Sequence, residues 1–321
     1  MTVALASAAP QASGVKWSIV LAVALTAILE VLDSTIVNVA LPLIQVFALV
    51  AVVSAVLFVV RGYGYPGNII DFGLLRDRSF AAANVTMIGF GLAMFGSIAI
   101  LPLFVQGLLG YPVLAAGYLF MPRGFAAAFS MVFTGAVLMN RFDPRGLVAL
   151  GLLLTGFGNL TLGWLNLNAG FWDLALPGVV SGFGMGLFFV PMSTLAFQNI
   201  GSDRQDEASG IYGVMRSLGS SIGIAIVGWQ VASRSQFHRA VLSEQITPFN
   251  AEVTAPLRPL GLTAQSPQGA EMMAGLVAAQ SSMPAFQDAF WLTGWAAFLM
   301  LPVVLILQRP ADGARAPAGA H

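Results

Sequence analysis

The stretch "ILEVLDSTIVNVALPLIQVFALVAVVSAVLFVV", residues 28–60, is apolar almost throughout and contains no loop. A helix needs roughly 20 apolar residues to cross the hydrocarbon core of a bilayer, which is about 30 Å thick. One helix over residues 17–60 would be about 66 Å long, twice that thickness. We therefore predict two membrane spans here, 17–41 and 44–60, that fold back on each other at Pro42.

The composition agrees with a membrane protein. Of the 321 residues, 57% are hydrophobic and only 9% are charged, and the mean hydropathy is +0.83. These values exclude an ordinary soluble globule. Fourteen basic and fourteen acidic residues cancel, so no net charge draws nucleic acid to the chain. Without cysteine, and with two histidines, the chain offers little for disulfides or metal binding, and we expect no metal and no cofactor.

Further long apolar segments follow the first two. We predict spans at 17–41, 44–60, 80–107, 114–138, 146–166, 173–198, 208–232 and 286–308. The other segments are a tail at 1–16, a cytoplasmic segment at 61–79, an outer loop at 233–285 with a short surface helix at "AEMMAGLVAAQ", and a tail at 309–321. The sequence therefore predicts an all-α fold, a polytopic transmembrane helical bundle of about eight spans.

The distribution of basic residues predicts the orientation, because lysine and arginine accumulate on the cytoplasmic side. With the N-terminus inside, the inner segments hold Lys16, Arg61, Arg76, Arg78, Arg141, Arg145, Arg204, Arg309 and Arg315. The outer segments hold only Arg234, Arg239 and Arg258. We therefore expect both termini in the cytoplasm.

Two carboxylates, Glu30 and Asp33, lie three residues apart in the first predicted span and share one helix face. Acids inside a membrane usually face the bundle interior or a water-filled path, and they often carry protons. This favours a proton or cation role for Asp33 and leaves the role of Glu30 open. The alternative is that one of them pairs with a basic residue such as Arg123.

Two arginines lie within predicted spans. Arg123, in "FMPRGFAAAF", is well inside its span and must snorkel, pair with an acid or line a cavity. Pairing is the favoured interpretation. Arg216, in "YGVMRSLGSSIG", lies nearer the cytoplasmic end, where snorkelling is easy and a structural role is as plausible as a functional one.

Glycines recur at four-residue spacing in two spans. "PGVVSGFGMGLFFVP" contains Gly178, Gly182 and Gly186, and Gly219 and Gly223 repeat the spacing. A phosphate-binding loop would need a preceding strand, whereas small residues in apolar spans let helices approach closely. We therefore predict that these glycines serve helix packing.

One pattern suggests an enzyme. "GSSIG", residues 219–223, matches the G-x-S-x-G pattern of serine hydrolases, but such a serine needs a base beside it and a strand-to-helix turn. His238 and His321 both lie outside the predicted spans. We therefore do not expect an enzyme.

Several motifs resemble one transporter family. "LDSTIVNVALP", residues 32–42, resembles the first-helix signature of the drug:proton antiporters of the major facilitator superfamily, the fourteen-span EmrB/QacA type. "IIDFGLLRDRSF", residues 69–80, is similar to the cytoplasmic segment before that family's ninth span. "LPLFVQGLLGYPVLAAGYLFMP", "GFGMGLFFVP" and "ASGIYGVMRSLGSSIG" resemble its later helices in their usual order.

The resemblance covers nearly all of residues 17–308 and implies a shortened chain. The family reaches the segment at 69–80 after eight spans, whereas this chain reaches it after two, so about six spans are missing, with the join near Gln45. Residues 80–308 then correspond to an intact C-terminal six-helix half. An even number of missing spans preserves the orientation that the basic residues predict.

The resemblance also implies roles for individual residues. Asp33 matches the family's first-span acid, which is associated with proton coupling, and Arg216 matches an arginine near the start of the penultimate span. "GAVLMNRFDPRG" resembles a weakened copy of the superfamily's inter-helix loop motif, with Gly135, Arg141, Asp143 and Arg145. Arg123 matches no family function.

The implied function is export of lipophilic compounds in exchange for protons across a bacterial inner membrane. The implied partners are the bilayer, the substrate and protons, with self-association or a periplasmic adaptor as further candidates. Phe95, Phe188 and Phe189 would form apolar walls for substrate, although helix packing or lipid contact explains each singly. The alternative is a non-transporting remnant or accessory membrane subunit, because alternating access needs two bundles around a midplane site.

Overall fold

The computed structural model describes Val53, residues 72–245 and residues 266–308, and each regular element in these ranges is a helix. The chain divides into two units, Met1–Asn68 and Ile69–His321, and the fold described below is that of the second. The predicted spans 17–41 and 44–60, with Glu30 and Asp33, lie outside the described residues apart from Val53.

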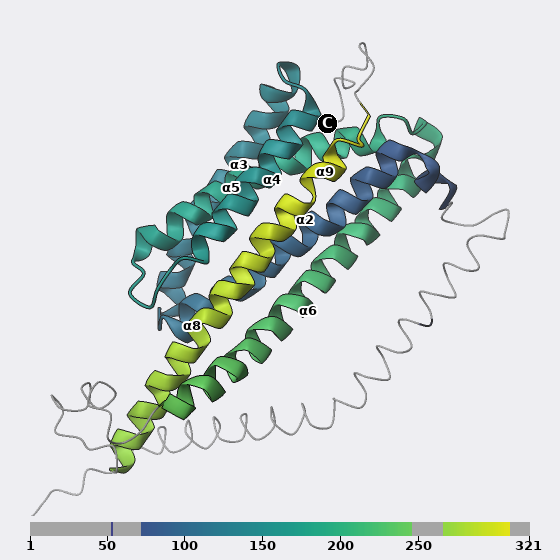
Figure 1. The fold of residues 1–321 in the computed structure, drawn as a ribbon. Helices are drawn as coiled ribbons and strands as arrows, with labels where there is room; N and C mark the ends of the chain where they lie inside the picture. The colour runs from purple at the N-terminus through teal and green to yellow at the C-terminus, as the bar shows by residue number, and fades with distance from the viewer. Residues whose placement is uncertain (1–52, 54–71, 246–265, 309–321) are drawn as a thin grey trace, which may run out of the picture. The chain divides into compact units, whose positions relative to one another are not determined.

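Six long helices make up the described bundle (Figure 1). They are α2 (Arg78–Pro102), α3 (Val113–Ala136), α4 (Pro144–Leu162), α5 (Phe171–Phe197), α6 (Gln205–Gln245) and α8 (Pro267–Leu299). Short turns of helix flank them: η1 (Phe72–Arg76), the π-helical η2 (Leu103–Leu108), η3 (Leu138–Asn140), η4 (Ser202–Arg204) and α9 (Leu301–Val304).

Five helical runs are long and apolar enough to cross a membrane. They are Arg78–Leu108, Val113–Asn140, Pro144–Leu162, Phe171–Phe197 and Ser202–Leu242. Each contains most of one span predicted between residues 80 and 232. The last predicted span, 286–308, corresponds to the C-terminal part of α8 together with α9.

Side-chain caps explain where several of these helices begin. The Asp77 carboxylate accepts a hydrogen bond from the backbone N–H of Phe80 at 2.8 Å and begins α2. Asp143 begins α4 in the same way, with Pro144 at the first helical position. Ser266 caps α8. Each cap satisfies a backbone N–H that has no partner within its own helix, so the first turn can form at that residue.

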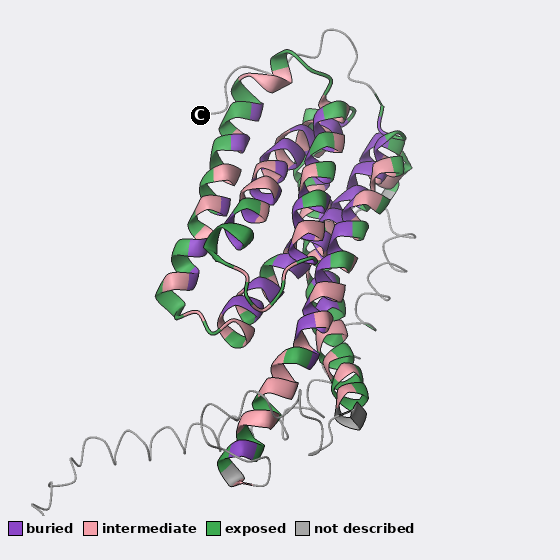
Figure 2. Cartoon of the chain, turned by 60° about the vertical axis from the view of Figure 1, so that its left-hand side comes forward, coloured by how far each residue is buried: buried purple, intermediate pink, exposed green. Residues whose placement is uncertain are grey.

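The bundle consists of two groups of three helices. In one, α5 packs against both α3 and α4, and in the other α6 packs against α2 and α8. Contacts of α8 with α4, and of α2 with α5, join the groups (Figure 1). Helices α3 and α6 are the least covered. Of their most apolar 18-residue stretches, only 17% and 22% of the residues are buried, against 50% or more in the other three candidate spans. Figure 2 shows the buried residues on the inward faces.

The prediction of a loop over residues 233–285 is corrected at both ends. Helix α6 continues to Gln245, and α8 begins at Pro267, so the predicted short surface helix is part of a 33-residue helix. Pro284 lies inside α8 without ending it, because its neighbours Met283, Ala285 and Phe286 are buried in the bundle, and packing offsets the roughly 3 kcal/mol cost of an interior proline.

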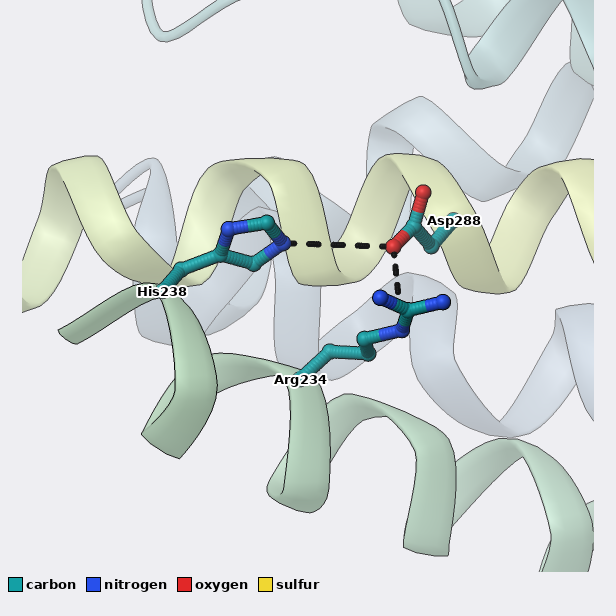
Figure 3. Close-up of polar contacts among 3 residues, drawn as sticks. All are labelled: Arg234, His238 and Asp288. Atoms are coloured by element: carbon teal, nitrogen blue, oxygen red, sulfur yellow. Dashed lines mark ion pairs between the residues drawn. The ribbon is translucent and has the colours of Figure 1, made fainter. Parts of the chain in front are cut away.

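Two polar residues of the predicted loop, Arg234 and His238, instead join α6 to Asp288 on α8 (Figure 3). The Asp288 carboxylate on α8 lies 3.5 Å from Nε of Arg234 and 3.9 Å from Nε2 of His238, both on α6. A helix with a polar face has a low mean hydropathy, so hydropathy can fall here without a change in secondary structure.

Candidate functional site

Arg123 lines an apolar pocket of about 290 Å³ between α2, α3 and α5. The other lining residues are Ile98, Leu101 and Pro102 from α2, Phe120, Gly124 and Ala127 from α3, and Met185 from α5. Arg123 is thus the one charged residue on a wall that is otherwise made of hydrocarbon, an aromatic ring, a glycine and a thioether.

The position of Arg123 along α3 keeps its charge away from both membrane surfaces. Helix α3 runs from Val113 to Ala136, so Arg123 lies about 15 Å along the axis from its start and about 20 Å from its end at a rise of 1.5 Å per residue. Its side chain is only 8% exposed. Snorkelling, which the sequence left open, is therefore not the conformation that the structure contains.

The guanidinium of Arg123 has no acceptor in the described part of the chain. Both Nη atoms are buried without a hydrogen-bond partner there, and no described carboxylate lies within ion-pair distance of them. A guanidinium offers five N–H donors, and leaving an ionised group buried and unpaired costs several kcal/mol. Within the described residues, Arg123 is therefore a buried guanidinium whose acceptor is not among them.

The glycines of α5 make room for α3 and for this arginine. A Cβ atom added at Gly178 would lie 3.6 Å from Cβ of Arg123, and one at Gly182 would lie 3.2 Å from Cγ of Arg123 and overlap its backbone carbonyl oxygen. One turn further, Gly186 faces Ser130, whose hydroxyl donates to the carbonyl of Phe183 at 2.6 Å. The glycine spacing therefore positions Arg123 as well as packing two helices.

The second glycine pair lies against α2. A Cβ atom at Gly219 would be 2.5 Å from the carbonyl oxygen of Ile88, and one at Gly223 would be 2.5 Å from Cα of Leu92. "GSSIG" thus lies inside a continuous helix, and its motif serine, Ser221, is not on the strand-to-helix turn that a nucleophilic serine of this pattern occupies.

Sequence reasoning missed a matching set of glycines on the facing helices. Gly151 on α4 approaches the backbone of α5 beside Gly184, and Gly156 on α4 approaches Gly294 on α8. Gly151 and Gly156 are five residues apart in "LGLLLTGFGNL", so they do not follow the four-residue repeat. Their contacts become apparent only in the structure, where each lies beside a glycine of another helix.

The remaining predicted residues lie apart from the Arg123 pocket. Arg216 is exposed on α6, and it is not among the residues that line the pocket. In the loop motif, Asp143 caps α4 by accepting from the backbone N–H of Arg145 at 3.0 Å, while Gly135 and Arg141 are exposed near the end of α3.

The proposed aromatic walls are core residues. Phe188 is fully buried and stacks on Phe90, with ring centroids 3.6 Å apart. Phe189 meets the same ring edge-on at 5.3 Å, and Phe95 packs against the same hydrophobic cluster. Phe120, which the sequence did not single out, is the aromatic residue that lines the pocket with Arg123.

Comparison with known proteins gives several relatives. The chain is 25% identical over 285 residues to the multidrug export protein EmrB of Escherichia coli K12, covering 87% of this chain and 54% of that protein. It is 24% identical over 229 residues to the colistin resistance protein EmrB of Acinetobacter baumannii, covering 69% and 44%. It is 31% identical over 192 residues to the uncharacterized MFS-type transporter EfpA of Mycobacterium tuberculosis H37Rv, covering 59% and 36%.

The chain spans about half the length of the curated relatives it matches. The family model of the Major Facilitator Superfamily matches residues 17–224, which is more than half of the chain. Together with five helices suited to crossing a membrane, this match identifies a multi-pass membrane protein. The chain belongs to the Major Facilitator Superfamily, a family of transporters and not of enzymes.

Proposed function

We propose that this chain takes part in the export of lipophilic compounds in exchange for protons. The observation that carries the proposal is the apolar pocket between α2, α3 and α5, which holds a buried charge near the middle of a spanning helix. Transporters of this kind bind substrate near the bilayer midplane, between helices. The names of two relatives, one for multidrug export and one for colistin resistance, support the same proposal of drug export.

Asp33 is the proposed proton site, with Glu30 as a second candidate. Both lie outside the described residues, and the argument rests on the cost of placing an acid in an apolar span, which is usually tolerated where the acid serves transport. Arg216, exposed on α6 within a candidate span, is proposed to pair with a carboxylate during the conformational cycle.

The proposed architecture has about eight spans with both termini in the cytoplasm of a bacterium. Helices α2 to α8 would form the C-terminal six-helix half of the superfamily fold. The excess of basic residues in the segments assigned to the inner side supports this orientation.

Efflux tests the function. Bacteria that lack their own pumps would produce the chain, be loaded with ethidium, a lipophilic cation, or with 8-anilinonaphthalene-1-sulfonate, a lipophilic anion, and be followed by fluorescence. We expect energised efflux of at least one dye that stops when an uncoupler is added. Asp33→Asn should abolish it, because the amide cannot release a proton, at unchanged amounts of inserted protein.

A second candidate function is that of an accessory membrane subunit or a non-transporting remnant. It is favoured by the exposed apolar faces of α3 and α6 and by the half-length match, because alternating access requires a second bundle. Absence of efflux for both dyes, with membrane insertion demonstrated, would favour this candidate over transport.

A further inference from the structure

Helices α3 and α6 each expose a long apolar face. On α3, Phe125 and Phe129 are 74% and 63% exposed, and on α6 Val214 and Ile224 are exposed as well. Lipid tails are as apolar as these side chains, so a bilayer alone could cover them. Other features of the two faces are needed to identify what does.

The exposed side of α6 also carries polar groups. Arg216, Ser217 and Ser221 are exposed and lie within the candidate span Ser202–Leu242. Charged side chains within a span usually face protein or a water-filled cavity, and serines there hydrogen-bond across helix contacts. This side of α6 therefore suits a protein partner better than lipid alone.

The two faces are complementary in shape. Small residues follow the exposed side of α6 at Gly210, Ser217, Ser221 and Gly228. A Cβ atom added at Gly210 or Gly228 would have nothing within 4 Å, so another helix can approach there closely. The large exposed rings of Phe125 and Phe129 on α3 are the kind of side chain that fills such a surface.

The charges at one end of the bundle are complementary too. Short connections join α3 to α4, α4 to α5 and α5 to α6, so the end of α3 and the start of α6 lie at the same end of the bundle. Residues 137–146 hold two arginines and one acid, whereas residues 202–208 hold three acids and one arginine. Arg141 and Asp206 are exposed, and Asp206 lies one turn before Gly210 on the exposed side of α6.

A second copy of the chain would present both faces at once. Copies of one chain enter a membrane in the same orientation, so two of them pair symmetrically about an axis along the membrane normal. Such an axis would repeat a contact between α3 of one copy and α6 of the other. The two halves of transporters in this superfamily are related by an axis of the same direction, and the chain spans about half the length of the relatives it matches.

We propose that two copies of this chain associate through these faces, with α3 of each copy packed against α6 of the other and Arg141 of each beside Asp206 of the other. This names a partner for the proposed exporter and rests on that function only for its role in transport. Association itself requires no substrate, so it is measured separately.

Disulfide cross-linking of the full chain in membranes tests the contact, because the chain has no cysteine. Within one copy α3 packs on α5, and α6 packs on α2 and α8, so a disulfide between α3 and α6 joins two copies. Phe129 precedes Arg141 by 12 residues and Ser217 follows Asp206 by 11, which places both about 17 Å from the charged end. Mild oxidation should therefore convert the double variant Phe129→Cys with Ser217→Cys into a species of twice 33.6 kDa.

The matched control moves one thiol to another helix at a similar depth. Phe157 is exposed on α4 and lies 13 residues after Pro144, where α4 begins. Phe157→Cys with Ser217→Cys should give several times less of the cross-linked species. If Phe129→Cys alone cross-links as well as the double variant, α3 meets α3 and the proposed contact is wrong.

Charge reversal tests the ends of the two helices. Arg141→Asp or Asp206→Arg alone should lower the yield of cross-linked Phe129→Cys with Ser217→Cys about fivefold, because the symmetry repeats each exposed ion pair. The two reversals together should restore it, which a merely structural effect of either would not allow. If the combined variant is no better than the single ones, the two ends do not meet and the proposal fails.

The mass of the unsubstituted chain in nanodiscs separates the remaining outcomes. A monomer there, with no more cross-linking than in the control, would leave the faces to lipid or to residues outside the described ranges and would overturn the proposal. A dimer without dye efflux would sustain the proposed partner and refute export. Efflux by a chain that stays monomeric would do the reverse.

Discussion

At the scale of the residue, Gly182 and Arg123 act as one unit. The four-residue spacing of glycines predicts a close helix contact, but it cannot tell which helix makes it or that an arginine stem lies there. Within the described residues Arg123 is buried without an acceptor, while Glu30 and Asp33, the acids that the sequence offers as its partners, lie outside them, and that pairing stays a prediction. Pairing depends on which helix faces meet, and hydropathy does not encode this.

Gly182→Ala should therefore disturb the pocket from the opposite helix. The new Cβ would overlap the backbone carbonyl of Arg123, so α3 must shift, and overpacking of this kind costs about 1–3 kcal/mol. We expect a lower Tm. Gly117→Ala, on α3 and with nothing within 4 Å of the added Cβ, should be neutral or stabilising, because alanine favours the helix. Equal Tm values for the two variants would contradict the packing argument.

At the scale of the element, the spans were predictable and their ends were not. Long apolar runs predict α2 to α5 to within a few residues, because a bilayer demands them. The C-terminal part of α6 and the N-terminal part of α8 were missed because both are more polar than the apolar runs that the prediction followed. Contacts between the two helices, such as those of Arg234 and His238 with Asp288, link α6 and α8 in this more polar region.

Two polar contacts between helices should contribute differently to the free energy of unfolding. Asn159 on α4 is fully buried, accepts from Ser97 at 3.0 Å and donates to the carbonyl of Ala93 at 3.3 Å. Its replacement by alanine should cost about 1–2 kcal/mol, since it leaves a buried hydroxyl without its acceptor. Asp288→Asn should cost about 0–1 kcal/mol, because Asp288 and Arg234 are 42% and 52% exposed and water screens the pair. Unfolding in mixed micelles ranks them, and a larger cost for Asp288→Asn would overturn this order.

At the scale of the whole molecule, each of the two spatial groups of three described helices combines helices from the first and the second half of the bundle in chain order. In chain order, α2, α3 and α4 make the first three and α5, α6 and α8 the second; α3 packs on α5, and α6 packs on α2. We propose that the two sets of three in chain order are the three-helix repeats of one half of the superfamily fold. This packing leaves α3 and α6 with broad apolar faces outward, where lipid or another bundle can cover them.

The proposal specifies the orientation of the whole molecule in the membrane, and cysteine labelling can test it. The chain has no cysteine, so each introduced cysteine is the only one that can react. Ala240 lies near the C-terminal end of α6 and Phe142 lies between α3 and α4, and both are exposed. A helix of 41 residues is about 62 Å long, so its end clears a bilayer core of about 30 Å.

A maleimide that cannot cross membranes should label Ala240→Cys in intact spheroplasts and Phe142→Cys only after permeabilisation. Asn166, in the segment between α4 and α5, provides a matched control, because one further crossing should return Asn166→Cys to the outer side. If Phe142→Cys alone were labelled in intact spheroplasts, the orientation of the bundle would be the opposite of the proposed one. The basic residues would then lie mainly outside, against the charge bias from which the orientation was inferred.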